Sequence, residues 1–308
     1  MVKDVTTSQN PVAHSSAVPD ARVQTNGPSD QSVPGQTDAA TTGAVDVLDV
    51  THAFLNHGTP LPVIDDVSLS VRPGTFVSLV GPSGSGKSTL LRLIAGLEAP
   101  VSGNIYVDGH RITGPDPRRG LVFQDPTLLP WMTVEQNVTL GPMIQGHAKD
   151  PQWMRRVDVM LEKVGLDGFR NAVPSELSGG MAQRASLARA LVTSPEVLLL
   201  DEPLGKLDAL TRSTLQKEIE RLWQAQGFTG IMVTHDVEEA LLLSDRVVVF
   251  SPRPAHVVAD IEVDLPRPRS TDHPRFRELG HQILDLLFRA DAFEARGVVN
   301  APRASTLL

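Results

Sequence analysis

The sequence predicts an α/β fold in which helices cover a mainly parallel sheet, with an antiparallel β subdomain and an inserted α-helical subdomain. Short apolar runs alternate with stretches of helical spacing, which is typical of parallel strands joined by helices. The segment Val45–Val71 instead has two longer runs with a turn between them, which is typical of antiparallel strands. Between Asp125 and Ser178 the strand signal disappears and helical spacing takes its place, which indicates a helical insertion.

The composition is that of a globular protein, with 308 residues of which 41% are hydrophobic and 21% charged. At this length the chain can bury one large core or two modest ones, and we expect one compact unit with tails. No apolar run approaches the roughly 18 residues of a membrane-spanning helix, and the N-terminus lacks the apolar part of a secretory signal. The absence of cysteine excludes disulfides and thiolate metal sites, and the net charge of -8 disfavours a nucleic-acid partner. The cytoplasm is therefore the expected location.

The first segment, residues 1–43, is predicted to be a disordered tail. It contains no Leu, Ile, Phe, Trp or Tyr, so burial cannot offset the entropy lost on ordering. A segment that binds a partner is the alternative. Residues 44–265 are predicted to form the main domain, with the helical subdomain at about 125–185.

The elements of this domain follow from its apolar runs. The predicted strands are Val45–Asn56 and Val63–Val71 with a turn over Asn56–Pro62, then Thr75–Val80, Leu121–Phe123, Val197–Leu200, Ile231–Val233 and Val247–Phe250. The predicted helices are Ser88–Ala95, Pro151–Val164 with its neighbours, and one that begins at Ser178. Residues 266–308 are predicted to hold the rest of a non-helical connector, Leu265–Arg269, and a helix within His281–Phe288.

A glycine-rich loop between a predicted strand and a predicted helix has the phosphate-loop pattern. Its residues are Gly81, Pro82, Ser83, Gly84, Ser85, Gly86, Lys87, Ser88 and Thr89. The glycines let the backbone wrap around a β-phosphate, Lys87 neutralises the β- and γ-phosphates, and Ser88 offers a hydroxyl to Mg²⁺. A purely structural Gly/Ser turn is the alternative, which the flanking strand and helix disfavour. The loop alone indicates a nucleotide.

Two carboxylates, Asp201 and Glu202, end the buried strand Val197–Leu200. Asp201 is placed to hold the Mg²⁺ shell, and Glu202 to polarise a water aimed at the γ-phosphate. Solvated acids at an ordinary strand end are the alternative. The phosphate loop in the same chain favours the catalytic interpretation.

Gln124 and His235 also follow predicted strands. Ligands of open α/β sheets gather at the carboxyl edge of the parallel strands, so both residues are candidates for the same site. The Gln124 amide is placed to contact Mg²⁺ or the attacking water. Taken alone, His235 is more often a structural histidine, and its position at this edge favours a catalytic role.

A second candidate for anion binding is the pentapeptide Leu177–Met181, which contains Ser178, Gly179 and Gly180. It opens a helix, so a hydroxyl and free backbone N–H groups face outward at the positive end of the helix dipole. One chain with two such helix starts, far apart in sequence, suggests that two copies face each other and share the nucleotide. We therefore expect a homodimer.

Together these motifs resemble the ATP-binding cassette (ABC) family, the ATPase subunits of membrane transporters, over Val45 to Val263. The phosphate loop, the signature Leu177–Met181 followed by Gln183-Arg184, the acidic strand and His235 occur in family order. The resemblance implies a P-loop NTPase core that hydrolyses ATP with Mg²⁺. It implies that Ser178, Gly179 and Gly180 bind the γ-phosphate of ATP held by the partner subunit. By the same resemblance, Asp208 lies in the loop that crosses the dimer interface, and Phe54 stacks on adenine, with a core role as the alternative for Phe54.

Within the family, the stretch Phe123–Val134 is similar to the nitrate, sulfonate and taurine importer branch, chiefly through Leu129-Pro130-Trp131. The segments Asp245–Pro254 and Leu265–Arg269 are similar to the same branch. A buried aromatic is the alternative for Trp131. The resemblance implies a peripheral protein on the cytoplasmic face of the inner membrane, bound to transmembrane permease subunits and served indirectly by a periplasmic or lipid-anchored solute-binding protein.

Four positions depart from the common pattern: Met181 stands in place of Gln, Gly205-Lys206 in place of a small or apolar pair, and Ala255 in place of Gly. Two other functions compete with transport. A soluble ABC-type ATPase acting on nucleic acid or ribosomes usually has paired cassettes, a long coiled coil or a basic tract, which this chain lacks. A nucleotide sensor without turnover would need neither Glu202 nor His235.

Overall fold

The computed structural model describes residues 42–147 and 150–295. The predicted tail lies outside these residues except for its last two positions, as does the predicted C-terminal segment beyond residue 295. Asp108 holds the first described residues, because its carboxylate accepts hydrogen bonds of 2.8–2.9 Å from the backbone N–H groups of Gly43 and Ala44.

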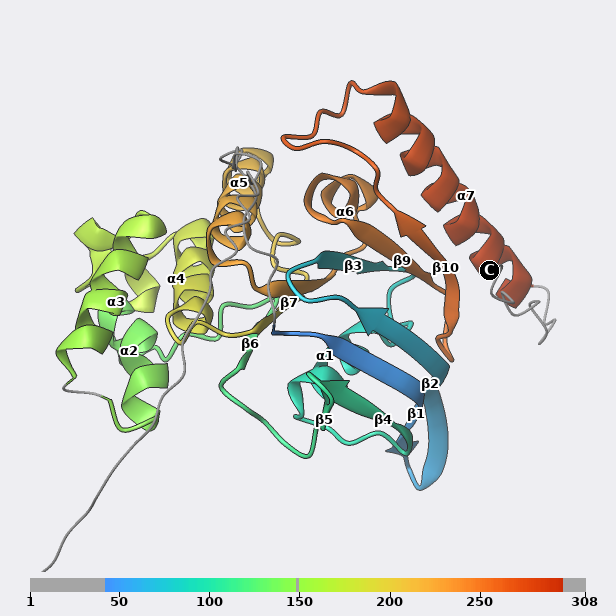
Figure 1. The fold of residues 1–308 in the computed structure, drawn as a ribbon, viewed down its shortest axis with the longest axis horizontal. Helices are drawn as coiled ribbons and strands as arrows, with labels where there is room; N and C mark the ends of the chain where they lie inside the picture. Colours follow the sequence, from blue (N-terminus) through green and yellow to red (C-terminus); the bar gives the residue numbers. More distant parts are fainter. Residues whose placement is uncertain (1–41, 148–149, 296–308) are drawn as a thin grey trace, which may run out of the picture. The chain divides into compact units, whose positions relative to one another are not determined.

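The larger of two sheets has six strands in the order β10-β9-β3-β8-β7-β6 (Figure 1). Neighbouring strands are parallel except for β9 and β10. The strands are β3 Phe76–Val80, β6 Arg119–Val122, β7 Val197–Asp201, β8 Thr229–Val233, β9 Arg246–Phe250 and β10 Val257–Glu262. All five residues of β3 are buried, as expected for a strand covered on both faces. The predicted mainly parallel sheet is confirmed, and β10 is a strand that the sequence did not predict.

The smaller sheet is antiparallel, with the order β2-β1-β4-β5. Its strands are β1 Val45–Asn56, β2 Thr59–Val71, β4 Ser102–Val107 and β5 His110–Arg111. The predicted turn over Asn56–Pro62 was too long: only His57 and Gly58 separate β1 from β2, and both have positive φ. Pro60 and Pro62 lie within β2, which an edge strand tolerates because proline lacks the N–H that an interior strand must donate.

Capping side chains mark where the helices α2 to α6 begin. The helices are α1 Lys87–Ala95, α2 Val134–Ile144, α3 Pro151–Lys163, α4 Gly179–Leu191, α5 Ala209–Gln226, α6 Val237–Leu243 and α7 Pro274–Ala295. Thr133 and Gln136 form a capping box at α2, and Asp150 caps α3 ahead of a proline at its first position. Three helices, α2 to α4, lie between β6 and β7 in the chain and group at the left of Figure 1. The last helix is much longer than the predicted His281–Phe288, since its flanking turns are also helical.

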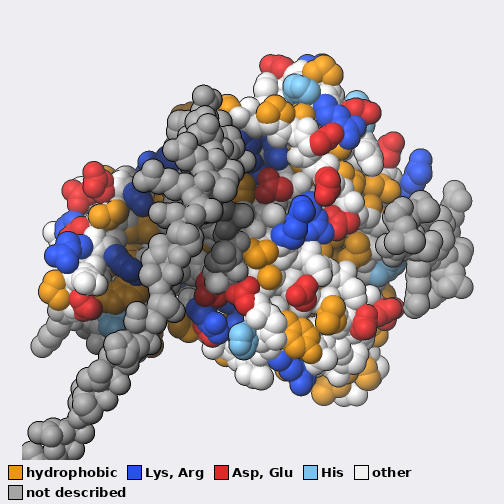
Figure 2. Space-filling model, in the orientation of Figure 1, with side chains coloured by type: hydrophobic (Ala, Val, Ile, Leu, Met, Phe, Trp, Pro, Cys, Tyr) orange, Lys and Arg blue, Asp and Glu red, His pale blue; other side chains and the backbone are white. Residues whose placement is uncertain are grey.

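The described surface carries both signs of charge. On the face shown in Figure 2, Lys and Arg side chains are interspersed with Asp and Glu rather than gathered in one basic area. Such a mixture differs from the clustered basic face that nucleic-acid binding requires.

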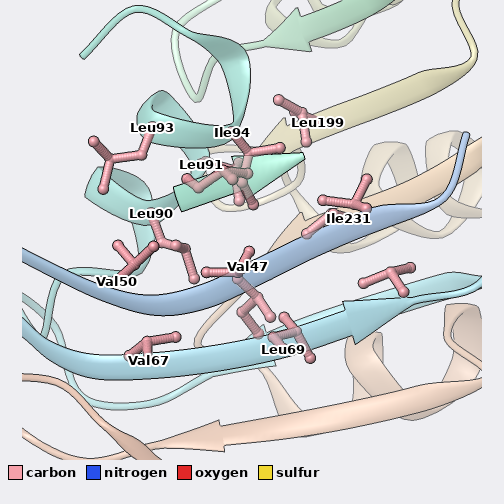
Figure 3. Packing of buried hydrophobic residues seen from close by; sticks show 14 of the residues in the cluster. Val47, Val50, Val67, Leu69, Leu90, Leu91, Leu93, Ile94, Leu199 and Ile231 are labelled. Atoms are coloured by element: carbon pink, nitrogen blue, oxygen red, sulfur yellow. The ribbon is translucent and has the colours of Figure 1, made fainter. Parts of the chain in front are cut away.

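Helix α1 packs between the two sheets and thereby fixes the loop that precedes it (Figure 3). Its buried side chains are Leu90, Leu91, Leu93 and Ile94. They meet Val47 and Leu69 of the small sheet on one side and Leu199 and Ile231 of the large sheet on the other. Burying each such side chain contributes roughly 1.5–3 kcal/mol. The opposite face of the large sheet packs against helices α2 to α5 in a second cluster, and α6 and α7 pack in a third.

Candidate functional site

The phosphate-loop residues connect β3 to α1, and α1 begins at Lys87. Gly86 must be glycine, because its φ is +119° and a Cβ there would lie 2.8 Å from both Cγ1 and the carbonyl oxygen of Val63. Gly84 also has positive φ, and a Cβ there would meet nothing within 4 Å. The loop is thus pressed against β2 at Gly86 and open at Gly84, where a bulky anion can approach the backbone.

Lys87 is 4% exposed and turns back into its own loop. Its Nζ donates to the carbonyl oxygens of Gly81 at 2.9 Å and Pro82 at 2.7 Å, and to Ser85 Oγ at 3.1 Å. Burial lowers the pKa of Lys87 to about 8, although the charges of Glu202 and Asp201 act in the opposite direction. A phosphate beside this ammonium would stabilise its charged form.

Ser88 and Asp201 lie together, since Ser88 Oγ donates to Asp201 Oδ1 at 2.6 Å. Burial raises the pKa of Asp201, and the hydrogen bond from Ser88 opposes the change. A hydroxyl and a carboxylate are oxygen ligands, the type that Mg²⁺ binds alongside the oxygens of substrate phosphates. The described residues contain no group of three or more His, Asp or Glu able to hold a metal by themselves. This donor set fits Mg²⁺ bound jointly by the protein and a nucleotide.

Glu202 lies where β6, β7 and β8 end. Gln124 Nε2 donates to Glu202 Oε2 at 3.0 Å, and His235 Nδ1 lies 3.5 Å from the same oxygen. The backbone of Glu202 has φ 45°, in the left-handed region that side chains other than glycine rarely adopt, and its N–H donates to Val233 O at 3.0 Å. The three residues predicted for this edge of the sheet are therefore in contact, with the carboxylate in the middle.

The loop after Glu202 packs against the same group. A Cβ on Gly205 would lie 3.5 Å from Glu202 Oε2 and 3.6 Å from Gln124 Nε2. Lys206 Nζ forms an ion pair of 2.6 Å with Asp125 Oδ1, and both side chains are more than half exposed. Sequence reasoning noted Lys206 as a departure and missed its partner, because the two residues are 81 positions apart.

The signature residues lie apart from the phosphate loop. Ser178 caps α4 by accepting a hydrogen bond of 3.3 Å from Met181 N, and both Ser178 and Gly179 are exposed. Gly180 is buried, and a Cβ there would lie only 2.2 Å from Thr211 Cγ2 of α5. Among the described residues, no hydrogen bond or ion pair joins Ser178, Gly179 or Gly180 to residues 81–89.

Two further predicted residues, Asp208 and Phe54, lie at the start of α5 and on β1. Asp208 caps α5, accepting hydrogen bonds from Leu210 N at 3.1 Å and Thr211 N at 3.0 Å. Phe54, predicted to contact adenine, is 37% exposed on β1 and makes an edge contact with the buried His52 at 4.9 Å between ring centroids. This exposure disfavours the core alternative for Phe54.

Residues 64–205 match the model of the ABC transporter family. The chain is 45% identical over 241 residues to the taurine import ATP-binding protein TauB of Roseobacter denitrificans, covering 76% of this chain and 90% of that protein. The chain belongs to the ABC transporter family. It is therefore a P-loop ATPase of the transport type, as the sequence predicted.

Other ABC proteins show the same relationship. The aliphatic sulfonates import ATP-binding protein SsuB of Bacillus cereus is 42% identical over 240 residues, covering 78% of this chain and 94% of that protein. The nitrate import ATP-binding protein NrtC of Synechococcus elongatus is 48% identical over 232 residues, covering 73% of this chain and 35% of that longer protein. A solved dimeric ATP-binding cassette in a post-hydrolysis state, bound to ADP and Pi, superposes with a TM-score of 0.64 at 30% identity, covering 72% of this chain and 100% of that one.

Proposed function

We propose that this chain is the ATP-hydrolysing subunit of an importer for a small anion such as taurine, an alkanesulfonate or nitrate. It works as a homodimer bound to two permease subunits at the cytoplasmic face of the membrane, and a solute-binding protein delivers the anion. The observation that carries the anion class is the 45% identity over 241 residues to a taurine import protein. The SsuB and NrtC relatives, at 42% and 48%, support the same class.

In the proposed mechanism, different residues of the site bind the phosphates and activate the attacking water. Gly81 to Thr89 hold the phosphates, with the Lys87 ammonium against the β- and γ-phosphates. Glu202 accepts a proton from the attacking water and so aims it at the γ-phosphate, while Gln124 and His235 fix the Glu202 carboxylate from two sides. Phosphoryl transfer needs positioning and charge neutralisation more than covalent chemistry, which these fixed polar groups supply.

Ser88, Asp201 and Gln124 are the residues that would hold Mg²⁺. The ion would neutralise charge that develops on the phosphate oxygens. Gln124 donates to Glu202 through its amide nitrogen, so its amide oxygen would remain for the metal.

The second copy completes each site. Ser178 and Gly179 are exposed at the start of α4, where a hydroxyl and N–H groups face solvent. We propose that they bind the γ-phosphate of ATP held by Lys87 of the partner, with Gly180 packing behind them. The dimeric form of the solved cassette supports this arrangement. Binding of ATP then closes the dimer, and hydrolysis removes the shared γ-phosphate and lets it open.

A groove beside Gln124 is the proposed contact with the permease. A cavity of about 360 Å³ lies next to that residue and is lined by Ala95, Leu97, Pro115, Asp116, Pro117, Arg119, Leu121 and Phe123. Trp131, on the loop that follows Gln124, is 73% exposed, which contradicts the buried alternative for this residue. None of the described helices is both long and apolar enough to cross a bilayer. The proposed association with the membrane is through the permease contact.

The test is uptake of labelled anions by the host and by a strain that lacks this gene. We expect the deletion strain to lose uptake of taurine, an alkanesulfonate or nitrate, and plasmid-borne wild type but not Glu202→Gln to restore it. Unchanged uptake of all three would refute the anion class. The purified protein should hydrolyse MgATP without nucleic acid. ATPase activity that requires DNA or ribosomes would instead favour the soluble ABC-type alternative.

A further inference from the structure

Arg212 occupies the first turn of α5, where a cation is disfavoured by the positive end of the helix dipole. The side chain is nevertheless held at three points. Its Nη2 donates to Leu207 O at 3.1 Å, its Nη1 lies 3.7 Å from Asp236 Oδ2, and its Nε lies 3.7 Å from Glu239 Oε1. The Nε atom is buried without a hydrogen bond, so the two carboxylates provide its electrostatic compensation. Because the helix dipole disfavours a cation here, the contribution of Arg212 must come from its contacts outside α5.

The two carboxylates follow His235 in the chain: Asp236 is the next residue, and Glu239 lies in the first turn of α6. Glu239 is only 8% exposed, and burial raises its pKa. Its other oxygen accepts a hydrogen bond of 2.8 Å from Thr234 Oγ1. Asp236 caps α6, and its own N–H donates to Thr234 Oγ1 at 3.0 Å. Arg212 therefore contacts Asp236, the residue after His235, directly and reaches Thr234, the residue before it, through Glu239.

His235 itself has little other support. Its side chain is 58% exposed, and its Nδ1 lies 3.5 Å from Glu202 Oε2. Its backbone is fixed by the neighbouring Thr234 and Asp236, whose positions depend on the Glu239 carboxylate and the α6 cap. Arg212 also donates a hydrogen bond to the backbone carbonyl of Leu207, in the loop that leads from Glu202 to Asp208. A single guanidinium thus joins the loop after the catalytic acid to the turn that bears the histidine.

We propose that Arg212 is a positioning residue for His235, tying the loop Leu204–Asp208 to the turn Thr234–Asp236 so that the imidazole stays beside Glu202. This inference rests on the proposed catalytic roles of Glu202 and His235. The planar guanidinium suits the task, because its fork of donors reaches a carbonyl and two carboxylates at once, which an ammonium on a lysine stem cannot do. Motion of the loop after Glu202 would then move the histidine with it.

The test compares Arg212→Gln with Arg221→Gln, a matched control on the same helix whose arginine donates to the backbone carbonyl of Lys163. We expect kcat for MgATP to fall about tenfold or more in Arg212→Gln, since a misplacement near 1 Å can cost a large rate factor. KM should stay within about twofold, because Arg212 does not touch the phosphate loop. Arg221→Gln should match wild type. Arg212→Lys should recover little, and Glu239→Gln should reproduce the loss from the other end of the contact.

Two measurements separate positioning from general destabilisation. In a His235→Ala background, Arg212→Gln should cause no further fall in kcat, because both changes remove one function. The imidazole resonance of His235 in labelled protein should shift in Arg212→Gln and not in Arg221→Gln. An unshifted resonance, or the same tenfold loss in the His235→Ala background, would overturn the inference. A wild-type protein without MgATP hydrolysis would instead refute the proposed function, and the resonance would still report on the position of His235.

Discussion

Two helix starts that are predicted to bind phosphate, at Lys87 and at Ser178, lie in opposite settings. The start of α1 is buried: Gly86 makes no side-chain cap, and Lys87 bonds to three oxygens of its own loop. The start of α4 is exposed: the hydroxyl of Ser178 caps its own helix, and no residue of the phosphate loop bonds to it within the described chain. An anion site at the start of α1 is complete within one chain. An anion site at the start of α4 needs a ligand that a second molecule brings to it. The difference supports sharing of the nucleotide between two copies.

The largest effect should come from the buried site. We expect Glu202→Gln to lower kcat by about 10²–10⁴-fold, because an amide cannot accept the proton from the attacking water. Binding of MgATP should stay near normal, since Lys87 and Ser88 are unchanged. Gel filtration with MgATP should then show an accumulated dimer. Phosphate release near the wild-type rate would remove Glu202 from its role.

A somewhat smaller loss is expected at the exposed start. Ser178→Arg should lower ATPase activity by about 10²-fold, comparable with removing one donor from a site of developing charge. The lesion should act on the partner's nucleotide. Mixing Ser178→Arg with Lys87→Ala subunits puts both lesions at one shared site and leaves the other whole, so some ATPase activity should return.

Strict coupling between the two sites could hide that recovery, so nucleotide occupancy should be measured as well. We expect one tightly held MgATP per heterodimer and none in either homodimer. If Ser178→Arg forms ATP-dependent dimers as readily as wild type, the two helix starts do not share a ligand.

A pair of alanines tests how the exposed start is built. Gly180→Ala places a Cβ 2.2 Å from Thr211 Cγ2, so α4 and α5 must separate, at about 1–3 kcal/mol of the free energy of unfolding. Gly179→Ala has its nearest neighbour, Leu207 Cδ2, at 3.9 Å and should unfold at the wild-type temperature while losing ATPase activity. Adding Thr211→Ser, which removes the clashing methyl, should restore the thermal stability of Gly180→Ala. Equal melting temperatures for both single variants would show that this contact can relax.

The smallest effect is expected for the exposed ion pair between Lys206 and Asp125. Lys206→Ala removes the ion pair with Asp125. Because both side chains are exposed, the free energy of unfolding should fall by only about 0.2–1 kcal/mol. The ATPase rate should change by less than about fivefold, and the change should shrink at high salt because exposed ion pairs are screened. A double-mutant cycle with Asp125→Asn measures the coupling. A loss that is large and insensitive to salt would point to direct contact of Lys206 with the nucleotide.

Much of the fold was predictable because its signals are local. The buried strand Phe76–Val80 is a short apolar run, and the phosphate loop follows it directly. The meeting of Gln124, Glu202 and His235 followed from a general rule, since the ends of parallel strands share one edge of a sheet. Their catalytic roles stay predictions. The strand Ser102–Val107 was missed although Ile105 and Val107 alternate with polar residues, a signal that could have been used.

The contacts of Arg212 and Lys206 could not be found in the sequence, because they join residues far apart in the chain. Lys206 and Asp125 are linked only once β6 and β7 are paired. The contact of Arg212 with Glu239 requires α5 to lie beside α6. One indirect signal was available for Arg212. A cation four residues after the helix cap Asp208 conflicts with the helix dipole, and such conflicts mark positions fixed by tertiary contacts.

At Glu202 the left-handed backbone favours glycine for stability, whereas the proposed function requires the glutamate side chain. Glycine adopts φ 45° without the cost of about 1–2 kcal/mol that a side chain incurs there, so Glu202→Gly would relieve the backbone while deleting the acid. A library selected only for survival at high temperature would be drawn toward this inactive substitution, and only a requirement for transport would keep the glutamate in place.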